Sequence, residues 1–94
     1  MAIRIEKKSD VYEINGVLNT QNFKALSDHF DLIIEKSAFM KISLSNIINL
    51  DSSGVKIIAS LYRKAARKNK VVFIVGLKDK FLVQLFKKEN IFTY

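Results

Sequence analysis

Apolar and polar side chains alternate along the first part of this chain. Period-two patterns over residues 2–7 and 11–18 predict two strands, and the polar residues 8–10 between them predict a turn. In the second strand, Tyr12 and Ile14 would lie on one face and Glu13 and Asn15 on the other. Because the connection is so short, we expect the two strands to pair antiparallel.

The pattern then changes to helical spacing over residues 21–36. Asn19 and Thr20 are candidate N-terminal caps, since both side chains can accept hydrogen bonds from free backbone N–H groups. A one-sided apolar stripe predicts that one face of this helix is buried. The stripe consists of Phe23, Leu26, Phe30, Ile33 and Ile34.

Alternation returns over residues 39–44 and predicts a third strand, with Met40, Ile42 and Leu44 facing one way. A second helix is expected to follow residues 51–54 and to end near Lys68. Its apolar positions recur at three- and four-residue spacing. They are Val55, Ile57, Ile58, Leu61, Tyr62 and Ala65.

Residues 71–75 are apolar without alternation, which predicts a strand covered on both faces or central in a parallel sheet. A third helix is expected over residues 79–88 with Phe81, Leu82, Leu85 and Phe86 inward, and a short edge strand over residues 91–94. The phenylalanines are expected in the core. The order β-β-α-β-α-β-α-β predicts an α/β domain with a mixed sheet of four to five strands and about three helices.

Composition narrows the classes of function. The 94 residues allow one domain, and the absence of cysteine excludes disulfides, a thiol nucleophile and a cysteine-based zinc site. The single histidine, His29, lies beside the apolar stripe of the first helix and is expected at the surface. We therefore expect no enzyme activity, no metal and no cofactor. Without a long apolar run or an apolar leader near Met1, we expect a cytoplasmic chain with no membrane span.

The net charge is +7, from sixteen Lys and Arg against nine Asp and Glu. Such a balance suits nucleic acid, anionic lipid or an acidic protein surface, and it does not choose among them. A basic cluster lies at the end of the second helix, where cations also complement the helix dipole. It consists of Arg63, Lys64, Arg67, Lys68 and Lys70. No aromatic residue interleaves with this cluster, which argues against nucleic acid.

The start of the second helix carries the most informative motif, Asp51-Ser52-Ser53-Gly54. Asp and Ser cap helix N-termini, so the motif predicts a capped helix start. A hydroxyl at the positive end of the helix dipole can also carry a phosphate. We expect Asp51 to act as the cap and Gly54 to allow a close backbone approach.

In this context the chain resembles the STAS domain, the fold of bacterial anti-sigma factor antagonists, over residues 1–94. Residues 46–55 are similar to the family's strand-to-helix turn. Residues 16–19 resemble its Gly-Glu-Leu-Asp segment, with Asn19 in place of the acidic residue. Residues 72–75 and 81–86 resemble its last buried strand and the helix after it.

The resemblance implies a switch. In the antagonists the matching serine, here Ser52, is phosphorylated by an anti-sigma factor that is itself a serine kinase, and a phosphatase removes the phosphate. Unphosphorylated protein would bind the anti-sigma factor. We expect the partner surface to comprise the turn 46–54, the start of the second helix and the loop 15–20. Its residues are Asn19, Asn46, Asn49, Asp51, Ser52, Ser53, Gly54 and Lys56.

Other interpretations of the sequence stay open. Ser52 and Ser53 would be no more than helix caps in a domain that uses the loop for binding alone. A lone STAS domain can also be a subunit of a lipid-transport ABC ATPase complex, which the basic charge suits better, or a scaffold component of a sensory assembly. Lys56 and the +7 charge depart from the family's simple antagonists, many of which are acidic.

Overall fold

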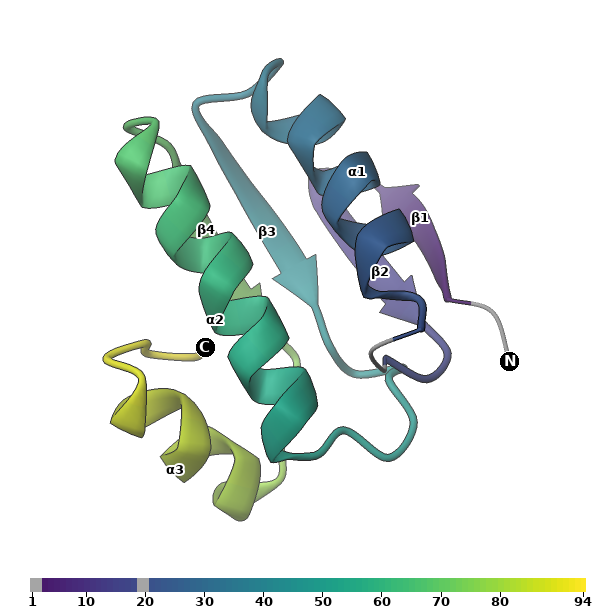
Figure 1. The fold of residues 1–94 in the computed structure, drawn as a ribbon, viewed down its shortest axis with the longest axis vertical. Coiled ribbons are helices and arrows are strands. Elements are labelled where there is room, and N and C mark those ends of the chain that lie inside the picture. The colour runs from purple at the N-terminus through teal and green to yellow at the C-terminus, as the bar shows by residue number, and fades with distance from the viewer. Residues whose placement is uncertain (1–2, 19–20) are drawn as a thin grey trace.

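Four strands and three helices make up the part of the chain that the computed structural model describes, residues 3–18 and 21–94 (Figure 1). Their order is β-β-α-β-α-β-α, which confirms the predicted order of the first seven elements. The elements are β1 Arg4–Lys8, β2 Val11–Asn15, α1 Phe23–Ile34, β3 Phe39–Ser43, α2 Ser52–Arg67, β4 Val71–Val75 and α3 Lys80–Lys88.

The strands form one mixed sheet in the order β1-β2-β3-β4. β1 and β2 pair antiparallel, with Ile5 opposite Ile14, and the β2–β3 and β3–β4 pairs are parallel. The parallel pairs require crossover connections, which α1 and α2 supply. In the β1–β2 turn, the Lys41 ammonium hydrogen-bonds the Asp10 carboxylate and lowers the pKa of that carboxyl group.

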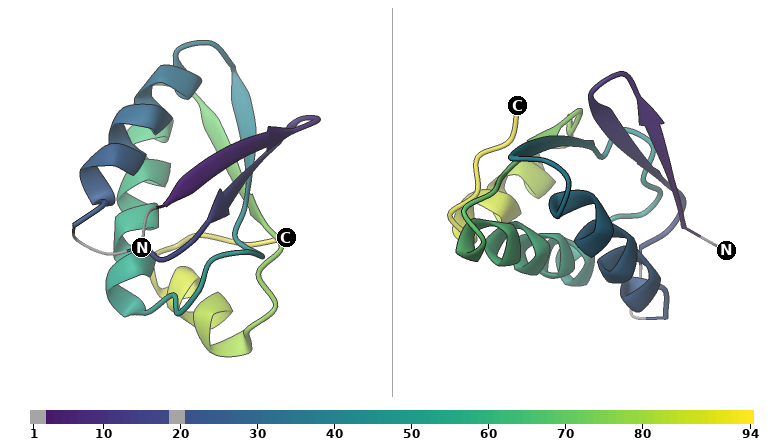
Figure 2. Two further views of the ribbon diagram at one scale, coloured as in Figure 1. Left: turned by 90° about the vertical axis from the view of Figure 1, so that its right-hand side faces the viewer. Right: turned by 90° about the horizontal axis from the view of Figure 1, so that it is seen from above.

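Both crossover helices lie across one face of the sheet, and α3 packs beside α2 (Figures 1 and 2). The core fills the space between these layers. Its largest fully buried side chains are Phe30, Phe86, Leu26, Ile34, Ile58, Ile74, Ile91 and Val55. Met40 and Ile42 of β3 and Leu44 just beyond it are buried, which confirms the alternation predicted there.

β4 lies at the edge of the four-stranded sheet, so the predicted central, doubly covered position is wrong. Val72 and Ile74 face the helices and are buried, whereas Val71 is 49% exposed. The residue on the opposite face, Phe73, packs edge-to-face against Phe39 and Tyr94. The continuous apolar run thus reflects a row of aromatic rings on the open face rather than a second layer of helices.

The chain after α3 runs back along β4 without forming a strand. The Tyr94 N–H donates to the Ile74 carbonyl at 2.8 Å, and the Gly76 N–H donates to the Tyr94 carbonyl at 3.1 Å. Thr93 makes a single parallel bridge to Ile74. The short edge strand predicted for residues 91–94 is therefore an isolated bridge in the structure, because the chain meets β4 at one point.

Three further predictions were wrong in detail. Phe81 points outward and is 68% exposed, because the buried face of α3 is centred on Phe86. Phe39 and Phe92 are also exposed, so not all phenylalanines belong to the core. α1 is two residues shorter at each end than expected, with Asn22 at its N-cap position. The predicted caps, residues 19 and 20, lie outside the described residues.

Candidate functional site

Asp51 stands at the N-cap of α2 and holds the first turn of that helix. Its backbone is extended, and its carboxylate Oδ1 accepts a hydrogen bond of 2.9 Å from the Gly54 N–H. Its carbonyl accepts a second bond of 2.9 Å from the Val55 N–H. These two bonds satisfy donors that a helix start leaves free, so Asp51 is the structural cap, as predicted.

Ser52 and Ser53 are the first two residues of α2, and both are exposed. Neither hydroxyl makes a hydrogen bond with a residue that the structure describes, because the capping bond comes from Asp51. The Ser52 hydroxyl therefore stands at the positive end of the helix dipole and is open to solvent. A phosphate there would meet the partial positive charge of the first helical turn.

Gly54 is buried at the third position of the helix. A Cβ at this position would lie 2.5 Å from Cδ1 of Leu50, closer than atoms can pack. The expected close approach at Gly54 thus exists, but its neighbour is the Leu50 side chain rather than backbone. Because glycine has no Cβ, the Leu50 side chain can pack directly against the first turn of α2.

The loops after β2 and after β3 lie side by side. Gly16 forms a parallel bridge with Ile47, and its carbonyl accepts a bond of 2.8 Å from the Ile48 N–H. The Asn46 side chain donates to Glu13 Oε1 at 3.0 Å, across 33 residues of sequence. The structure therefore joins the predicted turn 46–54 to the described part of the 15–20 loop; Asn19 lies outside the described residues.

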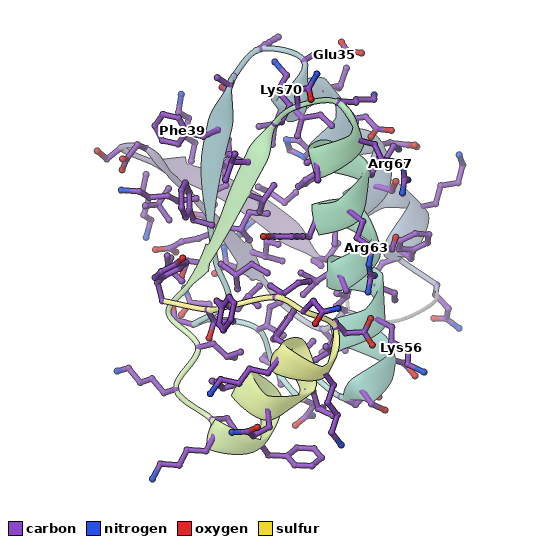
Figure 3. All side chains as sticks on the ribbon, turned by 90° about the vertical axis from the view of Figure 1, so that its left-hand side faces the viewer. Glu35, Phe39, Lys56, Arg63, Arg67 and Lys70 are labelled. Carbon is purple, nitrogen blue, oxygen red and sulfur yellow. The ribbon has the colours of Figure 1, made fainter. Side chains whose placement is uncertain are left out.

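Two more predicted residues frame this surface. Asn49 is exposed and adopts a left-handed backbone with φ of 53°, which Asn tolerates better than most residues. Lys56 is exposed one turn after Ser52 and lies on the outer side of α2 (Figure 3). Within the described residues it makes no ion pair, so its ammonium group is available to a partner or to a nearby phosphate.

A hollow of about 520 Å³ adjoins the site between the loop after β3 and the loop before α3. Asn49 and Leu50 line it from one side, and Leu77 and Asp79 from the other. Asp79 caps α3 by accepting a bond of 2.8 Å from the Phe81 N–H. Sequence reasoning missed this hollow, because its two walls come from segments that are distant in the sequence.

The basic cluster at the end of α2 divides in two. Arg63 forms an ion pair with Glu89, and Lys64 forms one with Asp31 at 2.6 Å. Arg67, Lys68 and Lys70 make no ion pair with a described residue. Among the described residues, no cluster of His, Cys, Asp and Glu could hold a metal ion, and no helix has the length and apolar character to cross a membrane.

A mixed sheet with helices on one face and a capped strand-to-helix turn at one end defines a class of small α/β domain. The STAS domain model matches residues 2–92, and the chain belongs to the STAS domain family. A comparison with curated protein sequences gave no significant match.

Three solved structures share the fold. The chain superposes on an anti-sigma factor antagonist from Mycobacterium paratuberculosis with a TM-score of 0.72 and 21% identity, covering 97% of this chain and 81% of that one. For the unphosphorylated anti-sigma factor antagonist SpoIIAA the TM-score is 0.67 at 14% identity, covering 92% of this chain and 82% of that one. For SiaC of Pseudomonas aeruginosa the TM-score is 0.62 at 12% identity, covering 99% of this chain and 95% of that one. At these identities the likeness concerns the fold.

Proposed function

We propose that this protein is an anti-sigma factor antagonist, a binding module that sequesters an anti-sigma factor and is switched off by phosphorylation of Ser52. The observation that carries the proposal is the division of roles at the start of α2. Asp51 caps the helix, which leaves the exposed Ser52 hydroxyl without a structural task. Both antagonist structures named above share the fold of this chain.

The physical basis of the switch is a change of charge on a preformed surface. A phosphate adds about −1.5 to −2 charge at neutral pH. In the free domain the N-terminus of α2 and the nearby Lys56 would stabilise it, so the fold tolerates the modification. A complex that buries Ser52 would instead bury an unpaired charge, which costs about 3–5 kcal/mol. A micromolar complex is worth only about 8 kcal/mol, so this cost would dissociate most of it.

The partners that this proposal requires are a serine kinase, which is the anti-sigma factor itself, and a phosphatase that removes the phosphate. The docking surface would comprise the loop around Asn46 and Asn49, the first turn of α2 and the neighbouring loop after β2. Hydrogen bonds between the loops at Gly16 and Ile48 support a single continuous surface. The chain itself would perform no catalysis.

The net charge of +7 favours a second candidate, a STAS subunit of a lipid-transport ABC ATPase complex. In that role the same surface would bind the ATPase, and Ser52 would remain unmodified. Replacing Ser52 by alanine would then leave the complex unchanged, and the captured protein would be an ABC ATPase rather than a serine kinase.

A capture experiment separates these functions. Immobilised wild type, Ser52→Glu and Ser9→Glu proteins are exposed to a lysate of the source organism, and bound proteins are identified by mass spectrometry. Ser9 is an exposed control in the β1–β2 turn, at the opposite end of β2 from the site. We expect wild type and Ser9→Glu to retain a serine kinase and Ser52→Glu to retain about tenfold less.

Incubating the captured kinase with ATP should then add about 80 Da to the wild type, the mass of one phosphoryl group, and nothing to Ser52→Ala. Equal retention of the kinase by wild type and Ser52→Glu would contradict the proposal. Capture of an ABC ATPase by all variants alike would establish the second candidate.

A further inference from the structure

The net charge of this protein is concentrated in one half of the molecule. Residues 56–94 contain ten Lys and Arg and two Asp and Glu, whereas residues 1–55 contain six Lys and Arg and seven Asp and Glu. The basic half consists of most of α2, β4 and α3, which lie together at one side of the fold (Figure 1). An asymmetry of this size is expected where a surface meets an anionic partner.

Part of this charge forms a line along α2. Lys56, Arg63 and Arg67 are separated by seven and four residues, so they share one face of the helix, and Lys70 follows just beyond its end. Figure 3 shows Lys56, Arg63 and Arg67 along α2, and Lys70 beyond the end of the helix where β4 begins. We call them the basic stripe. Ser52 lies four residues before Lys56, so a phosphate on it would extend the same line.

Most of the stripe is not neutralised within the fold. Arg63 pairs with Glu89, but Lys56, Arg67 and Lys70 form no ion pair with a described residue. One acidic side chain, Glu35 at the end of α1, lies toward the Lys70 end of the molecule in Figure 3. Because Lys56 and Arg67 are exposed, their cations are dispensable for folding and accessible to a partner.

The surroundings of the stripe favour carboxylates over lipid or nucleic acid. The apolar residues Val55, Ile58 and Leu61 of α2 are buried and Ile57 is half-buried, so α2 has no fully exposed large apolar side chain to insert into a bilayer. The one aromatic ring of α2, Tyr62, is half-buried against the core, so this helix offers no fully exposed ring on which a base could stack. Two of the four cations are guanidinium groups, whose fork geometry matches carboxylates and phosphates alike, and one of them, Arg63, already pairs with Glu89.

We propose that the basic stripe, Lys56, Arg63, Arg67 and Lys70, docks an acidic protein surface, and that phosphate on Ser52 weakens this docking by placing negative charge at the end of the stripe. The second part rests on the proposed function. Phosphate would pair with Lys56 and repel the carboxylates of the partner. The phosphate would act mainly on the Lys56 end of the stripe, because Arg67 lies about 22 Å farther along the helix, beyond the screening length of about 8 Å at physiological salt.

The test uses a fluorescein-labelled helical peptide of alanine and glutamate, with glutamates at four-residue spacing, and measures fluorescence anisotropy at two salt concentrations. The stripe variant is Lys56→Glu/Arg67→Glu. The control, Lys24→Glu/Lys36→Glu, makes the same change of net charge at exposed positions of α1 and the segment after it. We expect the stripe variant to bind the peptide about tenfold more weakly and the control to bind within about threefold of wild type.

Measurements on further variants and on other anionic ligands complete the test. Lys56→Gln/Arg67→Gln removes the two positive charges without introducing negative ones, and it should also weaken binding. Circular dichroism should show that all variants are folded. Ser52→Glu should weaken peptide binding by a few fold. Vesicles with anionic phospholipid and a duplex DNA should bind the wild type more weakly than the peptide does, at equal salt.

The proposal is overturned if the stripe and control variants lose the same affinity, or if vesicles or DNA bind more tightly than the peptide in a stripe-dependent manner. A captured kinase provides a further test. If it binds Ser52→Glu more weakly than wild type but binds the stripe variant as tightly as wild type, the docking proposal fails and the proposed function stands. Conversely, stripe-dependent peptide binding without any Ser52-dependent partner would refute the proposed function alone.

Discussion

Neighbouring residues at the start of α2 have separate tasks. Asp51 satisfies the Gly54 N–H and so stabilises the helix, whereas Ser52 is exposed and makes no side-chain hydrogen bond with the described residues. Gly54 leaves room for the Leu50 side chain, whose Cδ1 would lie only 2.5 Å from a Cβ at this position. Stability and any modification are therefore assigned to different residues, so a change at Ser52 can alter binding without unfolding the domain.

This separation leads to a prediction about stability. Asp51→Ala removes the cap and should lower the free energy of unfolding by about 1 kcal/mol, whereas Asp51→Asn should retain most of it. Ser52→Ala is the matched control and should change that free energy by less than about 0.5 kcal/mol. Urea denaturation followed by circular dichroism measures these values. A larger loss for Ser52→Ala than for Asp51→Ala would mean that Ser52 is the true cap.

Much of the site was predictable at this scale because capping is local chemistry. Asp51 precedes an apolar helical stripe, which is sufficient to predict its role. The hydrogen bond between Asn46 and Glu13 was not predictable, because it joins the loop after β3 to the middle of β2, and these are distant in the sequence. Such contacts follow from the order of strands in the sheet, which local pattern does not encode.

Among the elements, α3 limits what periodicity can predict. It has nine residues, and Phe81, Leu82, Leu85 and Phe86 are compatible with more than one buried face. The packing against α2 selects the face that contains Phe86, which leaves Phe81 68% exposed. The position of β4 was predicted wrongly for a similar reason. Its apolar run is typical of a central strand, but Phe73 is covered by other aromatic rings instead of a second layer of helices.

The two phenylalanines of α3 should therefore respond very differently to truncation. Phe86→Ala removes a fully buried ring and should cost about 3–5 kcal/mol of the free energy of unfolding. Phe81→Ala should cost less than about 0.5 kcal/mol, because its side chain already contacts water. Thermal or urea unfolding of the two variants compares them directly. Similar losses for both would mean that Phe81 is buried in solution.

At the scale of the whole molecule, β2, β3 and β4 run parallel, so their carboxyl ends lie at the same end of the sheet. The loops after β2 and β3 meet there, beside the start of α2 and the hollow next to α3. The sequence predicted the order of the elements and the antiparallel first pair. It could not place β4 at the edge or reveal the hollow, since both depend on how distant segments pack.

The distribution of charge also belongs to this scale. The basic stripe begins one turn after Ser52 and follows the exposed face of α2, so a phosphate would join an existing line of charge (Figure 3). Because most of these cations are unpaired in the fold, they affect binding more than stability. The phosphate would weaken binding of an acidic partner in two ways, by repelling its carboxylates directly and by pairing with Lys56 of the stripe.

The central claim, a switch at Ser52, is tested most directly by calorimetric titration of the captured kinase with unmodified protein and with protein fully phosphorylated at Ser52. Kinase-treated Ser52→Ala serves as the control and should bind like unmodified protein. We expect a dissociation constant at least about 100-fold higher for the phosphorylated form, the effect of burying one unpaired charge. Dissociation constants that agree within about threefold, below 1 kcal/mol, would contradict it.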